Sequence, residues 1–143
     1  MSFDLKLESG DVIIEDGDLS IVEDSDKLVQ DILKIISTPL GSNPFFPPYG
    51  SPITKVLIGT AMDSVFVEDI ASQQLRSSLE RLQQLQREQL KNNQIVSPDE
   101  QIAAIENVRV GQSADDPRYY IVNLTVINKA YQRIPVSFAV VSA

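Results

Sequence analysis

Residues 37–52 read STPLGSNPFFPPYGSP and hold five of the eight prolines and three of the nine aromatic residues of the chain. Proline fixes φ, removes a backbone donor and restrains the preceding residue, so such a loop loses little conformational entropy when it docks. Phe45, Phe46 and Tyr49 make the segment aromatic as well as stiff. It therefore predicts a positioning loop that packs against a surface. That surface is either the protein's own core or a partner, and both remain open at this point.

Apolar helical patterns lie on both sides of the loop. Residues 26–37 carry apolar side chains at spacings of three and four, which predicts a helix packed on most of its circumference. Asp24 or Ser25 is expected to cap its start, and Thr38-Pro39 to end it. After the loop, residues 53–58 predict one or two short helical turns.

A longer helix is expected from Asp63 or Ser64 to about Asn92. Its glutamine-rich second half is interpreted as solvated surface, and its apolar face as a stripe on the domain's own core. That stripe consists of Phe66, Ile70, Leu75, Leu79, Leu82 and Leu85.

The first 26 residues are acidic and predict a β-hairpin. In residues 12–22 (VIIEDGDLSIV), Asp16-Gly17 separates two apolar runs, which is a strong hairpin signal. Residues 1–26 contain nine acids and one base, whereas the rest of the chain has no net charge. The acidic block is interpreted either as a solvated edge that maintains solubility or as a face that orients a basic partner.

The C-terminal third predicts a short helix followed by three strands. Ser97-Pro98-Asp99-Glu100 has the form of a capping box, so a helix to about residue 105 is expected. The strands are expected at residues 104–111, 119–127 and 131–141, with alternating apolar positions. Pro135 cannot donate to a ladder, so the last strand is expected at an edge of the sheet, where another chain can extend it. The core-facing residues of the two last strands are expected to be Val122, Leu124, Val126, Ile134, Val136, Phe138 and Val140.

Composition argues against several classes of function. The chain has no cysteine and no histidine, which excludes disulfides, thiolate or imidazole metal sites and catalysis by a histidine base. Its negative charge argues against binding to nucleic acid, and no apolar run is long enough to span a membrane. Glu15, Asp16 and Asp18 lack the full spacing of a calcium loop. We expect no enzyme activity, no cofactor and no metal, and we expect no signal peptide.

The loop and its flanks resemble one known family. The apolar helix of residues 28–36, the Thr38-Pro39-Leu40-Gly41 step and the stretch NPFFPPYGS at residues 43–51 are similar to the baseplate wedge family of contractile-tailed phages. That family is also called GPW-like or "lysozyme-like" and has relatives in type VI secretion baseplates. The order of elements after the loop matches as well, so the resemblance covers residues 18–141.

The resemblance implies a structural role and particular contact residues. It implies binding to larger baseplate wedge subunits, a place beside the tube or hub proteins, and a sheet that accepts strands of the tail sheath protein. The loop residues implied in partner binding are Thr38, Gly41, Phe45, Phe46, Tyr49 and Gly50. Glu106 and Arg109 stand where the family has a Glu-Pro-Arg signature, although the proline is missing and the spacing is one residue longer. The implied sheath-binding edge carries Tyr131, Ile134, Val136 and Phe138, with the acidic hairpin as the other candidate edge.

Together these features predict one α+β domain over residues 1–143. It comprises an acidic hairpin at 1–24, helices with the stiff loop at 25–96, and a short helix with an antiparallel or mixed sheet of about three strands at 97–143. The expected function is a baseplate component of a contractile tail, located in the virion and assembled in the host cytoplasm. A tail-associated cell-wall hydrolase and a peptide-binding module that works by strand addition are the alternatives.

Overall fold

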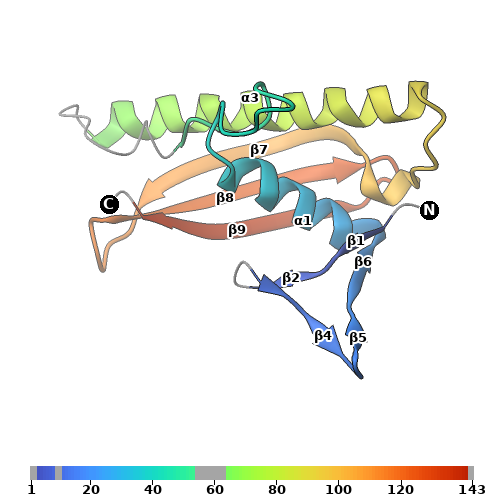
Figure 1. The fold of residues 1–143 in the computed structure, drawn as a ribbon. Helices are drawn as coiled ribbons and strands as arrows, with labels where there is room; N and C mark the ends of the chain where they lie inside the picture. The colour runs from blue at the N-terminus through green and yellow to red at the C-terminus, as the bar shows by residue number, and fades with distance from the viewer. Residues whose placement is uncertain (1–2, 9–10, 54–63, 142–143) are drawn as a thin grey trace.

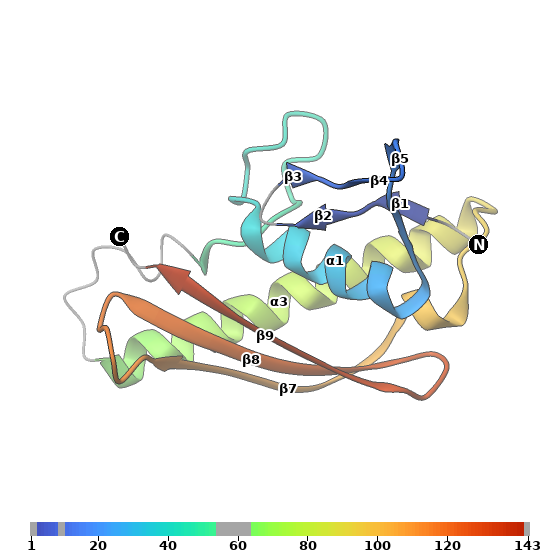
Figure 2. The ribbon, with the colours of Figure 1, turned by 90° about the horizontal axis from the view of Figure 1, so that it is seen from below.

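The computed structural model describes residues 3–8, 11–53 and 64–141. A three-stranded antiparallel sheet forms one layer, and helices α1 and α3 lie together on one of its faces (Figures 1 and 2). A small module of short strands lies beyond α1, on the side away from the sheet. The predicted α+β class, with N-terminal hairpin strands, two main helices and a C-terminal antiparallel sheet, is confirmed.

The N-terminal module consists of three two-stranded ladders that close into a triangle (Figure 1). The predicted turn is present at Asp16 and Gly17, whose φ values of 51° and 79° are those of a type I′ hairpin. At the centre, Lys6, Ile13 and Ser20 donate backbone hydrogen bonds to one another in a cycle, at 2.9–3.2 Å. The strands are β1 (Phe3–Leu5), β2 (Leu7–Glu8), β3 (Asp11–Val12), β4 (Ile14–Glu15), β5 (Asp18–Leu19) and β6 (Ile21–Glu23).

Polar side chains join this module to α1 (Asp24–Ser37). Gln30, which is 9% exposed, donates to the backbone oxygen of Leu5 (2.8 Å) and accepts from the backbone nitrogen of Leu7 (2.9 Å). It also donates to Asp4, whose carboxylate forms an ion pair with Lys34 at 2.7 Å. The side chain of one buried glutamine thus provides hydrogen-bond partners for a backbone N–H and a backbone C=O group at the edge of a strand, as a neighbouring strand would.

The start of α1 differs from the prediction. Glu23 is the N-cap residue and makes no side-chain cap bond. Asp24 instead accepts a hydrogen bond from the hydroxyl of Ser97 at 3.1 Å, which links the start of α1 to the start of the sheet region. The predicted end is confirmed, since the helix stops at Ser37 and Thr38 follows in extended conformation. Its core-facing residues are Leu28, Ile32, Ile35 and Ile36.

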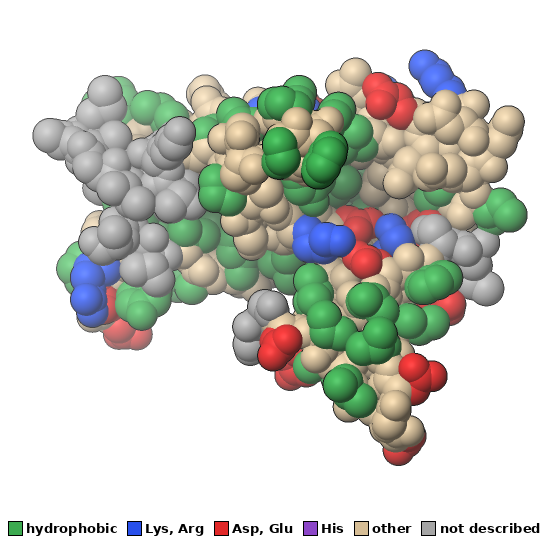
Figure 3. Space-filling view, viewed as in Figure 1, with side chains coloured by type: hydrophobic (Ala, Val, Ile, Leu, Met, Phe, Trp, Pro, Cys, Tyr) green, Lys and Arg blue, Asp and Glu red, His purple; other side chains and the backbone are tan. Residues whose placement is uncertain are grey.

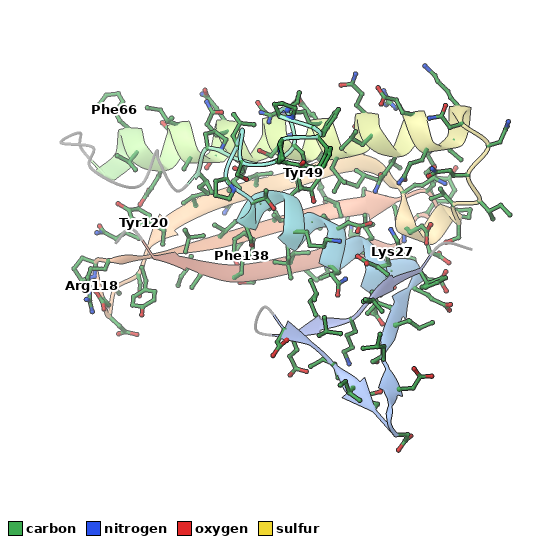
Figure 4. The ribbon with its side chains drawn as sticks, in the orientation of Figure 1. Lys27, Tyr49, Phe66, Arg118, Tyr120 and Phe138 are labelled. Atoms are coloured by element: carbon green, nitrogen blue, oxygen red, sulfur yellow. The ribbon has the colours of Figure 1, made fainter. Side chains whose placement is uncertain are left out.

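The long helix α3 spans Ser64–Lys91, close to the predicted end. Leu75, Leu79 and Leu82 are buried as predicted, but Phe66 is 64% exposed and points away from the sheet (Figure 4). Val67 and Ala71 are buried at that end instead, because the core-facing stripe there is displaced by one residue. The short helix expected over residues 53–58 and the cap at Asp63 lie outside the described residues, apart from Ile53, which is buried.

The sheet begins earlier than expected. The helix predicted from Ser97 to residue 105 is only a 3-10 turn, η1 (Pro98–Glu100), and the Ser97 side chain makes no cap bond there. Strand β7 (Ile102–Gln112) then pairs with β8 (Tyr119–Asn128), which pairs with β9 (Arg133–Val141). Val122, Leu124, Val126, Ile134 and Val136 are buried against the helices, and Phe138 and Val140 are half-buried, as the alternation predicts.

Candidate partner-binding surfaces

The loop after α1 is closed at its neck by backbone hydrogen bonds. Leu40 donates to the oxygen of Ser51 (3.2 Å), and Ser51 donates to the oxygen of Thr38 (2.9 Å). Gly41 donates across the loop to Pro47 at 3.2 Å, and the Thr38 hydroxyl donates to Lys34 at the end of α1. The chain therefore forms a compact Ω-type loop with fixed ends.

Gly50 is required at the neck for a steric reason. Its φ is +123°, and a Cβ atom there would lie 2.6 Å from the backbone oxygen of Thr38. Gly41 also has a positive φ, +84°, but a Cβ there would meet no atom within 4 Å. Of the loop residues predicted to bind a partner, Thr38 and Gly50 thus have a structural task inside the loop itself.

The three loop aromatics face different surroundings. Tyr49 is partly buried and packs against the hydrophobic core, and burial raises the pKa of its hydroxyl although the nearby Lys34 charge opposes this (Figure 4). Phe46 is 40% exposed, and Phe45 is 95% exposed. Arg81 of α3 donates to the backbone oxygens of Pro48 (3.0 Å) and Gly50 (3.2 Å), so the loop is held against the helix. The loop therefore packs on the protein's own core through Tyr49 and presents Phe45 to solvent.

Glu106 and Arg109 both lie on β7 and are exposed. Glu106 sits in a register shift between Ile105 and Asn107, so it is the additional residue of a β-bulge. Its carboxylate pairs with Arg133 of β9 at 3.2 Å rather than with Arg109. These three charged residues line a shallow depression of about 530 Å³ on the sheet.

The outer edge of β9 consists of backbone N–H and C=O groups that are not used in pairing with β8. Tyr131 lies in the turn before β9, with a φ of +63° and 90% exposure, so the expected strand at 131–141 begins at Arg133 instead. Ile134 and Val136 point into the core, and Phe138 is half-buried against it. Asn128 donates its backbone nitrogen to Gln132, so odd-numbered residues of β9 direct their N–H and C=O groups away from β8. Pro135 is one of these outward positions, which explains why the ladder passes it without interruption.

At the opposite edge of the sheet, side chains of α3 bond to both ends of β7. Gln86, which is buried, accepts from the Ile102 nitrogen (2.8 Å) and donates to the Glu100 oxygen (3.0 Å). At the same end of β7, Gln83 donates to the oxygens of Ile102 and Ala103. At the other end, Glu68 accepts from the Gln112 nitrogen. The glutamine-rich half of α3 is therefore not simply solvated. Within the described residues, no such bonds reach the outward backbone of β9.

A groove of about 860 Å³ separates the N-terminal module from α1. Val29 and Leu33 of α1 form its apolar side, and Glu15, Glu23 and Asp26 lie among its lining residues. No group of three or more acidic side chains in the described part of the chain is arranged to hold a metal ion. The described helices include none that is long and apolar enough to cross a bilayer.

The chain shares its fold with a protein described as a proposed tail lysozyme. That protein is from Geobacter sulfurreducens and its crystal structure was determined at 1.44 Å resolution. The two superpose with a TM-score of 0.60 over 82% of this chain and 90% of the other, at 10% sequence identity. No family model matches the sequence, and no curated protein matches it either. At this identity the similarity is one of fold.

Several residues that organise these surfaces were not predicted from the sequence. Gln30, Gln83 and Gln86 act through buried or edge hydrogen bonds, and a glutamine on a helix gives no local signal for such a role. The first strands do have a local sequence signal. Phe3, Leu5 and Leu7 alternate with polar residues, which is the period of a strand.

Proposed function

We propose that this chain is a structural, non-catalytic component of a contractile-tail baseplate, located in the virion. In this proposal it binds larger wedge subunits and accepts a strand of the tail sheath at β9. The fold shared with the proposed tail lysozyme of Geobacter sulfurreducens and the resemblance of residues 18–141 to the wedge family support this role.

The observation that carries the proposal is the difference between the two edges of the sheet. Side chains of α3 bond to both ends of the β7 edge, whereas no such bonds reach the odd-numbered residues of the nine-residue strand β9, within the described residues, although these direct their backbone groups outward. An edge of this kind pairs with an extended segment of another chain through main-chain bonds. Pro135 removes one donor from it, so the incoming strand must tolerate one unpaired acceptor.

The wedge contact is assigned to the exposed side of the loop. Phe45 extends from a loop that is fixed by its neck, by Tyr49 and by Arg81, so little entropy is lost when it is buried by a partner. Exposed aromatic residues on rigid elements are typical interface anchors. In this proposal Glu106 and Arg109, on the sheet, make a second and more polar contact.

Strand addition is tested by Ser137→Pro. Ser137 is an outward position of β9, so proline there removes a donor of the open edge without removing a bond to β8. The control Ser137→Ala removes the same hydroxyl, which donates to Asn123, but keeps the N–H group. We expect particles with the proline variant to show baseplates and tubes without sheath in negative-stain micrographs. Normal sheaths on these particles, with the variant incorporated, would refute strand addition at β9.

The wedge contact is tested by Phe45→Ala, with Phe66→Ala as an exposed aromatic control on α3. Both variants are expected to unfold at the wild-type urea midpoint, because neither side chain is buried. Only Phe45→Ala should reduce the amount of this chain in purified baseplates, measured by quantitative immunoblot. Tyr49 is unsuitable for this test because it packs on the core.

A cell-wall hydrolase is the second candidate, and two observations favour it. The neighbour of similar fold is described as a proposed tail lysozyme, and several carboxylates line the groove beside α1. A glycosidase needs two such carboxyl groups at a defined separation across a cleft. Release of muramyl sugars from purified peptidoglycan by the wild type, lost in Glu23→Gln, would replace the structural proposal with this one.

A further inference from the structure

The N-terminal module has one face made of three apolar pairs. Opposite residues of an antiparallel ladder share a face, and the register pairs Leu5 with Ile21, Leu7 with Val12, and Ile14 with Leu19. Each of the three chain segments, or arms, contributes two of these residues: Leu5 and Leu7, Val12 and Ile14, or Leu19 and Ile21. The two residues of an arm are two positions apart, so all six side chains lie on the same side of the triangle. We call these six residues the apolar face.

The apolar face is exposed to solvent. Its residues range from 37% exposed at Leu5 to 67% at Ile14. The space-filling view shows the corresponding hydrophobic patch over the module (Figure 3). A contiguous apolar patch on a soluble domain indicates an interaction site, whereas isolated apolar residues do not.

The exposure of this face does not result from loose attachment of the module. Its opposite side, which includes Asp4 and Ile13, is half-buried, and Gln30 and the Asp4–Lys34 ion pair fix it to α1. Within the described part of the chain, the apolar face is the side turned away from that attachment. A partner would therefore meet a preformed surface.

Charge around the face selects the kind of partner. The first 26 residues carry nine acids and one base, Glu23 lies on the same side of its ladder as Ile21, and acidic side chains border the hydrophobic patch (Figure 3). A second copy would bring the same charge against it, and nucleic acid or an anionic membrane would be repelled as well. A polypeptide with apolar side chains flanked by lysine or arginine complements both the apolar face and the negative charge around it.

We propose that the apolar face docks a basic, apolar segment of another protein chain. Leu7 and Ile21 also contribute to the lining of the groove beside α1, and Glu23 and Asp26 belong to the same lining. Apolar side chains of the segment cover the face, and its cationic side chains reach these carboxylates and the acids of the hairpin. The docking site is separate from the β9 edge and the Phe45 loop, so it goes beyond the proposed tail function.

The test uses the full chain and two labelled synthetic peptides of equal length, in which leucine and isoleucine alternate with lysine or with glutamate. Binding is measured by fluorescence anisotropy at low and at physiological salt. We expect the lysine peptide to bind and the glutamate peptide not to bind. The double variant Ile14→Asp/Leu19→Asp should bind at least about tenfold more weakly, although it adds negative charge. Plain charge attraction predicts the opposite change.

Two control variants separate the contributions. Asp16→Asn/Asp18→Asn keeps the face and the type I′ turn but removes two charges, so it should weaken binding and reduce its salt dependence. Ile95→Asp changes an apolar residue that is 75% exposed elsewhere on the chain and should bind as the wild type does. If the aspartate variant disrupts the module by circular dichroism, Ile14→Thr/Leu19→Thr replaces it, since threonine favours strands.

Three results would overturn the inference. Equal binding of the lysine and glutamate peptides would show that the acidic side chains do not select a basic partner. Undiminished binding by the Ile14/Leu19 variants would show that the apolar face is not the docking site. A wild-type dimer in sedimentation that these variants dissociate would identify a second copy as the occupant. Failure of strand addition at β9 would leave the inference untouched, because peptide binding is measured on the isolated chain.

Discussion

Gly50 is the residue on which the geometry of the loop depends most directly. Gly50→Ala would place a Cβ atom 2.6 Å from the Thr38 oxygen at a φ of +123°, so the neck of the loop must open. We expect a loss of about 2–3 kcal/mol in the free energy of unfolding, measured by urea denaturation. Gly41→Ala is the matched control, because only its φ is unfavourable, and it should cost about 1 kcal/mol. Equal losses in the two variants would contradict the steric explanation.

The Asp4–Lys34 ion pair makes stability depend on pH at both extremes. Burial alone would raise the pKa of Asp4, but the Lys34 ammonium, together with hydrogen bonds from Gln30 and the Leu5 backbone, outweighs it and holds that pKa below the ordinary 3.8. The same contact raises the pKa of Lys34 above 10.5, although burial opposes this. The stabilisation is therefore present between these values. It is lost as pH falls below 3.8 and protonates Asp4, and again as pH rises above 10.5 and deprotonates Lys34.

Asp4→Asn tests this assignment. The difference in urea midpoint between the wild type and Asp4→Asn should be constant near neutral pH and shrink as pH falls below 3.8. If the difference in urea midpoint stays the same in acid, Asp4→Asn destabilises the protein for a reason other than loss of the carboxylate charge.

At the scale of single residues, local chemistry was predictable and long-range bonding was not. The Asp16-Gly17 turn and the stop at Thr38-Pro39 were predicted because each depends on the φ preferences of adjacent residues. Ser97 looked like a helix cap, but its hydroxyl bonds to Asp24, a residue distant in sequence. No local pattern contains such a contact.

At the scale of elements, the packing of α3 along β7 is the least expected feature. Gln86→Leu preserves the apolar length of the side chain but leaves the buried nitrogen of Ile102 and the oxygen of Glu100 without this partner. We expect a loss of about 2–3 kcal/mol and faster hydrogen exchange at the Ile102 amide. Gln84→Leu, at an exposed position of the same helix, should change neither quantity. Slow exchange at Ile102 in Gln86→Leu would show that another group protects this edge.

Periodicity predicted where the helices lie better than which residues they bury. The pattern of α1 and the alternation of β8 correspond to observed burial, because one period holds over the whole element. Phe66 was assigned to the core, yet Val67 occupies it, since apolar residues at that end of α3 fit two adjacent stripes. Residues 102–105 were expected in part as helix, and tertiary pairing with β8 overrides that local preference.

At the scale of the whole molecule, Gln30 connects the N-terminal module to the helical layer. Gln30→Ala removes bonds to Leu5, Leu7 and Asp4 at once. We expect faster hydrogen exchange throughout residues 3–8 and unchanged exchange in β8, because the sheet has its own core contacts. Uniformly faster exchange across the molecule would instead mean that the module and the sheet unfold as one unit.

The overall arrangement followed from the sequence only in part. The α+β class and the edge position of the last strand were predictable from the order of patterns and from Pro135. The bonds from α3 to the β7 edge join residues far apart in sequence, such as Gln83 and Ala103, so only the structure reveals them. The separation of Tyr49 from Phe45 within one loop likewise depends on the position of the core.

The cyclic bonds among Lys6, Ile13 and Ser20 impose a constraint on chain length. In each arm, one apolar residue of the apolar face precedes the Lys6, Ile13 or Ser20 position and another follows it directly. The two apolar residues are therefore two positions apart in all three arms. A single-residue insertion between Leu19 and Ile21 would turn one of them to the opposite side from its partner, because strand side chains alternate. Apolar residues in the arms can be exchanged for one another at small cost, whereas the number of residues between them cannot change by one. In this module the length of the chain is therefore specified more strictly than the identity of its side chains.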